Sequence, residues 1–132
     1  MIRIGAAQVV QTADIAANTA KVLEYMERGA KKGIELLCFP ETHIAGYRVG
    51  MLTPDTPVDS DGLARASEAI RAKTRELSMG VIFGTETPNP GGKPFNSAQE
   101  VNEKGALLAV PHKSRLTPAA AQAQALPVGG QP

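Results

Sequence analysis

Little in this sequence points to a disulfide-stabilised, membrane-spanning or nucleic-acid-binding protein. The 132 residues include one cysteine, Cys38, so no internal disulfide bond can form, which excludes a disulfide-rich secreted scaffold. No apolar run approaches the roughly 20 residues that a membrane-spanning helix needs. The formal net charge is only +1, so no sequence-wide basic field favours nucleic acid or an anionic membrane as a partner.

Aromatic side chains are also scarce. Trp is absent, and the chain has three Phe and two Tyr, which is few for a domain that fills its own core. Apolar residues nevertheless make up 42% of the chain and charged residues 20%, a composition typical of folded globular proteins. The N-terminal residues do not have the pattern of a signal peptide. We therefore expect one cytoplasmic domain.

Hydrophobic periodicity predicts strands that alternate with helices. Residues 2–10 are apolar and partly alternating, as in a strand. Apolar residues then recur at helical spacing from Asp14, a suitable N-cap, to a stop at Gly33. Residues 34–39 form an apolar run interrupted only by Glu35, typical of a strand covered on both faces, and Pro40 ends it. This order indicates a βα-type fold.

A second helix and strand follow. Apolar residues at helical spacing over 63–77 predict a helix capped by Ser60 or Asp61. Gly80 is expected to close this helix, and residues 81–84 are expected to form the next strand. The pattern thus contains two βα units.

The rest of the chain predicts a hairpin and an uncharged end. Residues 95–101 and 106–110 have the character of strands, joined by a turn. Residues 119–132 carry no charge and include a possible short helix over 119–125. We therefore predict a domain over residues 1–118, followed by a tail or truncated connection over 119–132.

Two polar residues stand directly after predicted strands, where open α/β sheets carry their chemistry. Glu41 follows the apolar run and Pro40, and partial burial there would raise its pKa towards that of a general base. Lys113 follows the strand at 106–110, where an ammonium group is suited to stabilise an oxyanion. The alternative for each is an exposed charge at the end of a strand.

Other reactive residue types carry weaker signals. Cys38 lies inside the apolar run, and a buried thiol in apolar surroundings is unreactive, so we predict a packing role. Glu41, His43, Glu86 and His112 do not have the spacing of a known metal-ligand pattern, so no metal site is predicted.

Several segments occur in a characteristic order between about residue 2 and residue 118. They are IRIGAAQ, then AANTAKVLEYMERGAKKGIELLCFPET followed by Gly46-Tyr47, then GVIFGTE, FNSAQEVNEKG and PHKSRL. Together they resemble the nitrilase superfamily of carbon–nitrogen hydrolases. The resemblance implies an α+β fold, the four-layer α-β-β-α sandwich of that family, of which this chain would supply the first half.

The resemblance also implies a Glu–Lys–Cys triad. Glu41, in a Phe-Pro-Glu context, would be the base, and Lys113 would hold the negative charge of the tetrahedral intermediate. Tyr47 would line the substrate pocket, with an exposed loop tyrosine as the alternative, and Asn96 would brace the neighbouring strand. The family's nucleophilic cysteine is expected beyond this chain, because Cys38 corresponds to a core strand.

The chain departs from the family pattern after Lys113. Many members carry a second acidic residue there, whereas residues 114–132 contain no Asp or Glu. Half of a sandwich should also leave apolar sheet surface uncovered, and uncovered sheets associate readily. We expect either a fragment or a chain that covers this surface by self-association.

These observations leave three functional hypotheses. The first is a hydrolase of amide, carbamoyl or nitrile carbon–nitrogen bonds, homo-oligomeric, with small-molecule substrates and no metal or organic cofactor. The second is a non-catalytic, self-associating interaction module. The third is a Rossmann-like nucleotide-binding domain, which is disfavoured because GAAQVVQ, after the first strand, lacks the Gly-x-Gly-x-x-Gly pattern.

Overall fold

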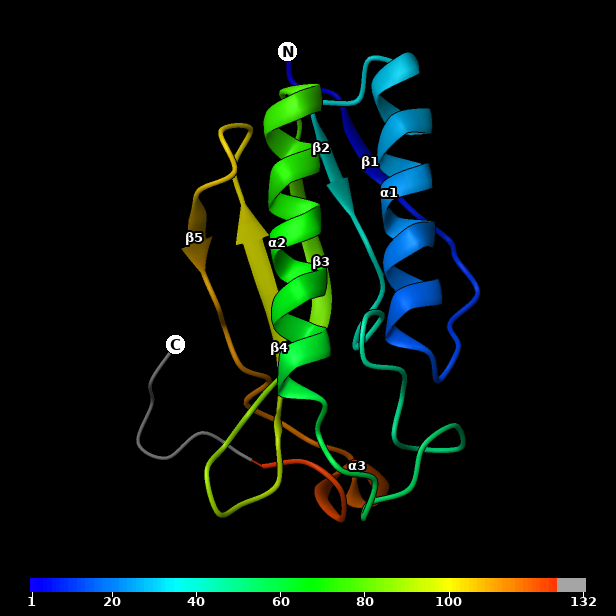
Figure 1. Cartoon of the computed structure of the whole chain (residues 1–132), viewed down its shortest axis with the longest axis vertical. Helices are drawn as coiled ribbons and strands as arrows, with labels where there is room; N and C mark the ends of the chain where they lie inside the picture. The colour runs from blue at the N-terminus through cyan, green and yellow to red at the C-terminus, as the bar shows by residue number, and fades with distance from the viewer. Residues whose placement is uncertain (126–132) are drawn as a thin grey trace.

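A five-stranded mixed sheet forms the centre of the structure, a computed structural model that describes residues 1–125 (Figure 1). Its strands stand in chain order, with β1, β2 and β3 parallel and with β4 and β5 antiparallel to their neighbours. The strands are β1 (Ile4–Ala6), β2 (Leu36–Cys38), β3 (Gly80–Thr87), β4 (Phe95–Val101) and β5 (Leu107–Ala109).

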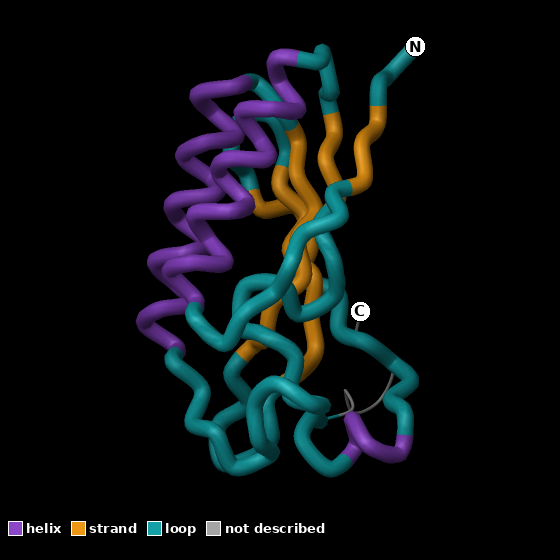
Figure 2. The backbone as a smooth tube through the Cα atoms, turned by 90° about the vertical axis from the view of Figure 1, so that its right-hand side faces the viewer, coloured by secondary structure: helices purple, strands orange, loops and turns teal. Residues whose placement is uncertain are grey.

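Two long helices, α1 (Ile15–Lys31) and α2 (Ser60–Leu77), lie side by side on one face of this sheet (Figures 1 and 2). The result is one helix layer on one sheet layer, which is half of the predicted four-layer sandwich. A short helix, α3 (Pro118–Ala121), follows the last strand. Within residues 1–125 no helix combines the length and apolar character needed to span a membrane.

The sequence predicted the long helices well, with two corrections at α2. Asp14 caps α1 as expected, because its carboxylate accepts a hydrogen bond from the Ala17 amide at 2.9 Å. The cap of α2 is Asp59 rather than Ser60 or Asp61, because it is the Asp59 carboxylate that accepts from the Gly62 amide at 2.8 Å.

The end of α2 also differs from the prediction. Ser78, with φ 51°, is the left-handed residue at which the helix ends. Gly80 already belongs to β3, where its amide donates to the Glu35 carbonyl at 2.8 Å. The local pattern could not distinguish these roles, because a long-range backbone bond recruits Gly80 into the sheet.

The core lies between the helices and the sheet and consists mainly of aliphatic residues and methionine. Burying each such side chain contributes about 1.5–3 kcal/mol, which compensates for the scarcity of aromatics. Within residues 1–125 Phe83 in β3 is the largest of the fully buried side chains, and it is 1% exposed. Its companions in the core include Val22, Met26, Leu37, Leu63, Ile70, Met79, Val81 and Val101.

Within residues 1–125 the opposite face of the sheet is not covered by a helix (Figure 2). Ile4 in β1 is 61% exposed, and Ile82 in β3 is half-buried on the same face by strand alternation. The expected uncovered apolar surface is therefore present. Cys38, predicted to pack in the core, is instead half-buried, because the register places it between Ala6 and Ile82 on this open face.

Candidate active site

Glu41 and Lys113 meet at the ends of two chain segments that are 72 positions apart. Lys113 Nζ lies 2.7 Å from Glu41 Oε1, so the ammonium donates a charge-assisted hydrogen bond to the carboxylate. Asn96 Nδ2 donates to the same oxygen at 2.5 Å. The side chains of Lys113 and Glu41 are 35% and 46% exposed. The pair is therefore preorganised yet open to a small molecule.

Backbone pairing with β4 places Lys113 beside Asn96. The Lys113 amide donates to the Asn96 carbonyl at 2.7 Å, and the Ala98 amide donates to the Pro111 carbonyl at 3.0 Å. The segment before Lys113 therefore continues along β4 after β5 has ended. Glu41 is held from the other side, because Gln11 Nε2 donates to its backbone carbonyl at 2.5 Å.

The surroundings of Glu41 lower its pKa, contrary to the sequence prediction. Burial by itself raises the pKa of this carboxyl. The hydrogen bonds from Lys113 and Asn96, with the positive charge of Lys113, outweigh that effect and place the pKa below its ordinary value. Glu41 is therefore an ionised carboxylate at neutral pH.

The pair lies in a hollow of about 350 Å³, large enough for a small organic molecule. Glu41, Asn96, Lys113 and His112 supply its polar lining, and residues of β3 and β4 such as Ile82 supply apolar wall. This combination fits a small ligand with one polar group.

His112 is a wall residue that the sequence prediction considered only as a metal ligand. Its ring stacks on Phe95 with a centroid distance of 4.6 Å, and its Nδ1 lies 2.7 Å from Ser97 Oγ. The Thr87 hydroxyl donates to Ser97 Oγ in turn at 2.8 Å. The imidazole is thus fixed by two independent contacts. Its position directly before Lys113 is the only signal in the sequence for this placement.

Tyr47 does not join Glu41 and Lys113. It is half-buried in the turns that follow Glu41 and is not part of the lining of the hollow. Its backbone carbonyl accepts a hydrogen bond from the Leu52 amide at 3.0 Å. Its contact with substrate therefore stays a prediction from the resemblance, without support from the lining of the hollow.

Residues after Glu41 form a buried polar cluster. Arg48 Nε donates to Glu86 Oε1 at 2.6 Å and Arg48 Nη2 donates to Oε2 at 3.0 Å, in a pair whose side chains are each 2% exposed. Arg48 Nη1 also donates to the carbonyls of Thr53 and Thr56. Glu86, weighed as a metal ligand from the sequence, is therefore committed to an ion pair. No group of three or more His, Cys, Asp or Glu side chains suited to a metal ion occurs in residues 1–125.

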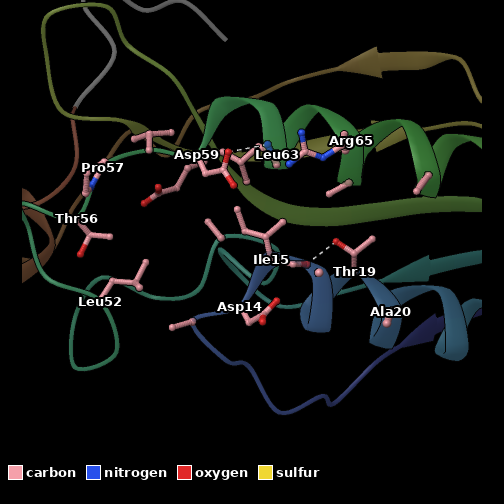
Figure 3. Close-up of a pocket in the computed structure, with 18 of the residues that line it drawn as sticks. Asp14, Ile15, Thr19, Ala20, Leu52, Thr56, Pro57, Asp59, Leu63 and Arg65 are labelled. Carbon is pink, nitrogen blue, oxygen red and sulfur yellow. Dashed lines mark hydrogen bonds between the residues drawn. The ribbon is translucent and has the colours of Figure 1, made fainter.

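A second hollow, of about 740 Å³, opens on the helix side of the molecule (Figure 3). It lies between the N-terminal parts of α1 and α2, with Ile15, Leu63 and Val58 among its apolar lining. Arg48 and Glu86 line it but are already paired with each other. The smaller hollow is the better candidate site, because a carboxylate and an ammonium group in its lining contact each other and remain partly exposed to solvent.

Comparisons with known proteins identify the family and the fold. The family model for carbon-nitrogen hydrolases matches residues 3–128. The chain belongs to the carbon–nitrogen hydrolase family. No curated protein matches it.

Solved structures of this family share the fold. An amidase from Nesterenkonia sp. superposes with a TM-score of 0.82 and 21% identity, over 99% of this chain and 49% of the amidase. The NitN amidase of strain AN1 gives 0.83 and 21%, over 100% and 51%. A mutant of the AN1 amidase in complex with butyramide gives 0.82 and 22%, over 99% and 49%. The chain thus spans about half the length of the structures that it matches, and its fold is that of one half of these amidases.

Proposed function

We propose that this chain carries the base and the oxyanion-stabilising cation of a carbon–nitrogen hydrolase that acts on small amide, carbamoyl or nitrile substrates. Glu41 is the base and Lys113 is the cation. The observation that carries the proposal is the 2.7 Å contact between Lys113 Nζ and Glu41 Oε1 at the edge of a hollow. Family membership adds the reaction class.

The chemistry follows from the two charges. A cysteine thiol from outside this chain gives its proton to the Glu41 carboxylate, and the sulfur attacks the substrate carbon. For an amide, the electron pair of the broken C=O π bond moves to oxygen, where the Lys113 ammonium stabilises it. The intermediate then collapses to a thioester as the C–N bond breaks, and the leaving amino group takes the proton from Glu41 and departs as ammonia. Water hydrolyses the thioester in a second step.

Short aliphatic amides are the first substrates to test. A mutant of the AN1 amidase has been crystallised with butyramide, and another carries acrylamide added to its active-site cysteine. The small hollow beside Glu41 suits molecules of this size. Small amides are therefore the substrates that we propose first for this chain.

The test is ammonia release from butyramide by the reading frame continued past Pro132, compared with the 132-residue chain alone. We expect turnover only in the longer product, because the thiol lies outside the shorter one. Glu41→Gln or Lys113→Ala should reduce the rate of the longer product by roughly 10²–10³. Glu24→Gln is a matched control, since Glu24 also pairs with a lysine, Lys21 at 2.9 Å, and is 49% exposed.

Near-normal turnover in either site variant would contradict the proposed roles. A reading frame that stops at Pro132, or turnover by the short chain, would contradict the proposal that the thiol lies beyond it.

The second candidate is a non-catalytic module that associates with copies of itself. Its support is the uncovered sheet face, on which Ile4 is 61% exposed. Sedimentation equilibrium tests this second candidate, and the ammonia-release assay tests the first. Self-association of the 132-residue chain that is abolished by Ile82→Lys favours the module, and a monomer at high concentration counts against it.

A further inference from the structure

Gly84 in β3 lies directly beneath the peptide that carries Glu41. A Cβ atom at Gly84 would stand 2.4 Å from the Pro40 carbonyl oxygen, 2.4 Å from the Thr42 nitrogen and 2.7 Å from the Glu41 carbonyl carbon. Real Cβ atoms essentially never come closer than 3.0 Å to such neighbours. Because all three are backbone atoms, no change of side-chain rotamer can relieve the overlap.

Hydrogen bonds fasten this peptide to β3 on both sides of the crossing. The Phe39 amide donates to the Ile82 carbonyl at 2.8 Å, and the Ile44 amide donates to the Gly84 carbonyl at 3.1 Å. Between them Thr42 adopts φ 49°, a left-handed conformation that is unusual for a β-branched residue. Local strain of this kind persists only where surrounding contacts impose it.

We propose that Gly84 is a positioning residue for Glu41. Its missing side chain lets the peptide of Glu41 lie against β3, so that Glu41 Oε1 reaches Lys113 Nζ and Asn96 Nδ2. A methyl group there would displace the peptide by about 1 Å to restore ordinary contact distances. This inference deepens the proposed function and rests on it for its catalytic meaning, but its test needs no substrate.

The experiment is an NMR pH titration of the 132-residue chain, observing the Glu41 side-chain carboxyl carbon and using Glu41→Gln for assignment. In Gly84→Ala the midpoint for Glu41 should move upward, in the same direction as in Lys113→Met, because the contacts that lower its pKa are stretched. Gly80→Ala is the matched control in the same strand. Its Cβ would lie 3.2 Å from a Leu36 side-chain atom, which can yield, so the midpoint should stay unchanged.

A second variant covers the case in which Gly84→Ala does not fold. Thr42→Gly tolerates the positive φ and should restore folding to the double variant, while the Glu41 midpoint stays shifted. In the unmodified chain, the Ile44 amide should exchange with solvent as slowly as the amides inside β3. An unchanged Glu41 midpoint in a folded Gly84→Ala chain, an equal shift in Gly80→Ala, or rapid exchange at Ile44 would each overturn the proposal. If the longer product did not hydrolyse amides, the proposed function would fail, but the Glu41 midpoints and the Ile44 exchange rate would still test the role of Gly84.

Discussion

Two of the acid–cation pairs within residues 1–125 have nearly equal lengths but opposite settings. Arg48 and Glu86 are 2.6 Å apart with side chains 2% exposed, and Arg48 also holds two backbone carbonyls. Lys113 and Glu41 are 2.7 Å apart but remain 35% and 46% exposed beside a hollow. Distance alone therefore does not distinguish the buried pair from the pair proposed to be catalytic, whereas burial and the number of committed hydrogen bonds do.

The buried pair should matter most for stability. Arg48→Met would leave the Glu86 carboxylate buried without its cation, and losing one partner of such a pair costs about 3–5 kcal/mol of unfolding free energy. Urea unfolding followed by circular dichroism would measure the change. The double variant Arg48→Met/Glu86→Leu should recover part of the loss, and a single variant as stable as the original chain would refute this view of the pair.

His43 is a third case, because it is a buried titratable group that lacks a partner within residues 1–125. His43 is fully buried, and neither of its ring nitrogens has a hydrogen-bond partner within residues 1–125. Burial lowers its pKa, and the nearby Asn18 backbone, outside hydrogen-bond geometry, offsets this only in part. The ring is therefore neutral in the folded chain at neutral pH.

This predicts a loss of stability in mild acid. Because the folded-state pKa of His43 lies below its unfolded value, its contribution is complete above the unfolded value and is lost as pH falls through the folded one. The unfolding free energy should fall by up to about 1.4 kcal/mol per pH unit below pH 6.5. His43→Leu should flatten this dependence between pH 7 and 5 in urea titrations, and an unchanged slope would contradict the prediction.

The exposed pair should contribute least to stability. Lys113→Ala should change the unfolding free energy by no more than about 1 kcal/mol, because solvent screens the pair. The difference should vanish as pH falls through the lowered pKa of Glu41, where the carboxylate loses its charge. Parallel urea titrations at neutral and acid pH would measure both. A loss as large as that in Arg48→Met would mean that the pair is structural.

Local pattern predicted much of the fold. The helical periodicity located α1 and α2, and the strand at 95–101 coincides with β4. The prediction was weaker where a long-range contact decides the outcome. Gly80 joins β3 through a bond to Glu35, and Cys38 faces outward through its register with Ala6 and Ile82. Part of the predicted tail 119–132, residues 126–132, lies outside the described residues.

The candidate site shows the same division. The resemblance singled out Glu41 and Lys113, but only the fold brings them to 2.7 Å and adds Asn96 on the same oxygen. The predicted rise in the pKa of Glu41 was wrong because a sequence reveals burial more readily than the partners that oppose it. His112 and Gly84 were missed as residues of the candidate site, because only tertiary packing places them beside Glu41 and Lys113.

The sequence by itself determined the periodic elements and the family pattern, since both depend on residue types at short or fixed spacing. The tertiary structure alone decided which charges are buried, which of them meet across 72 positions, and that no Cβ atom fits beneath the Glu41 peptide. These properties depend on the packing of strands from distant parts of the chain, where a displacement of an ångström changes a hydrogen bond or creates a clash.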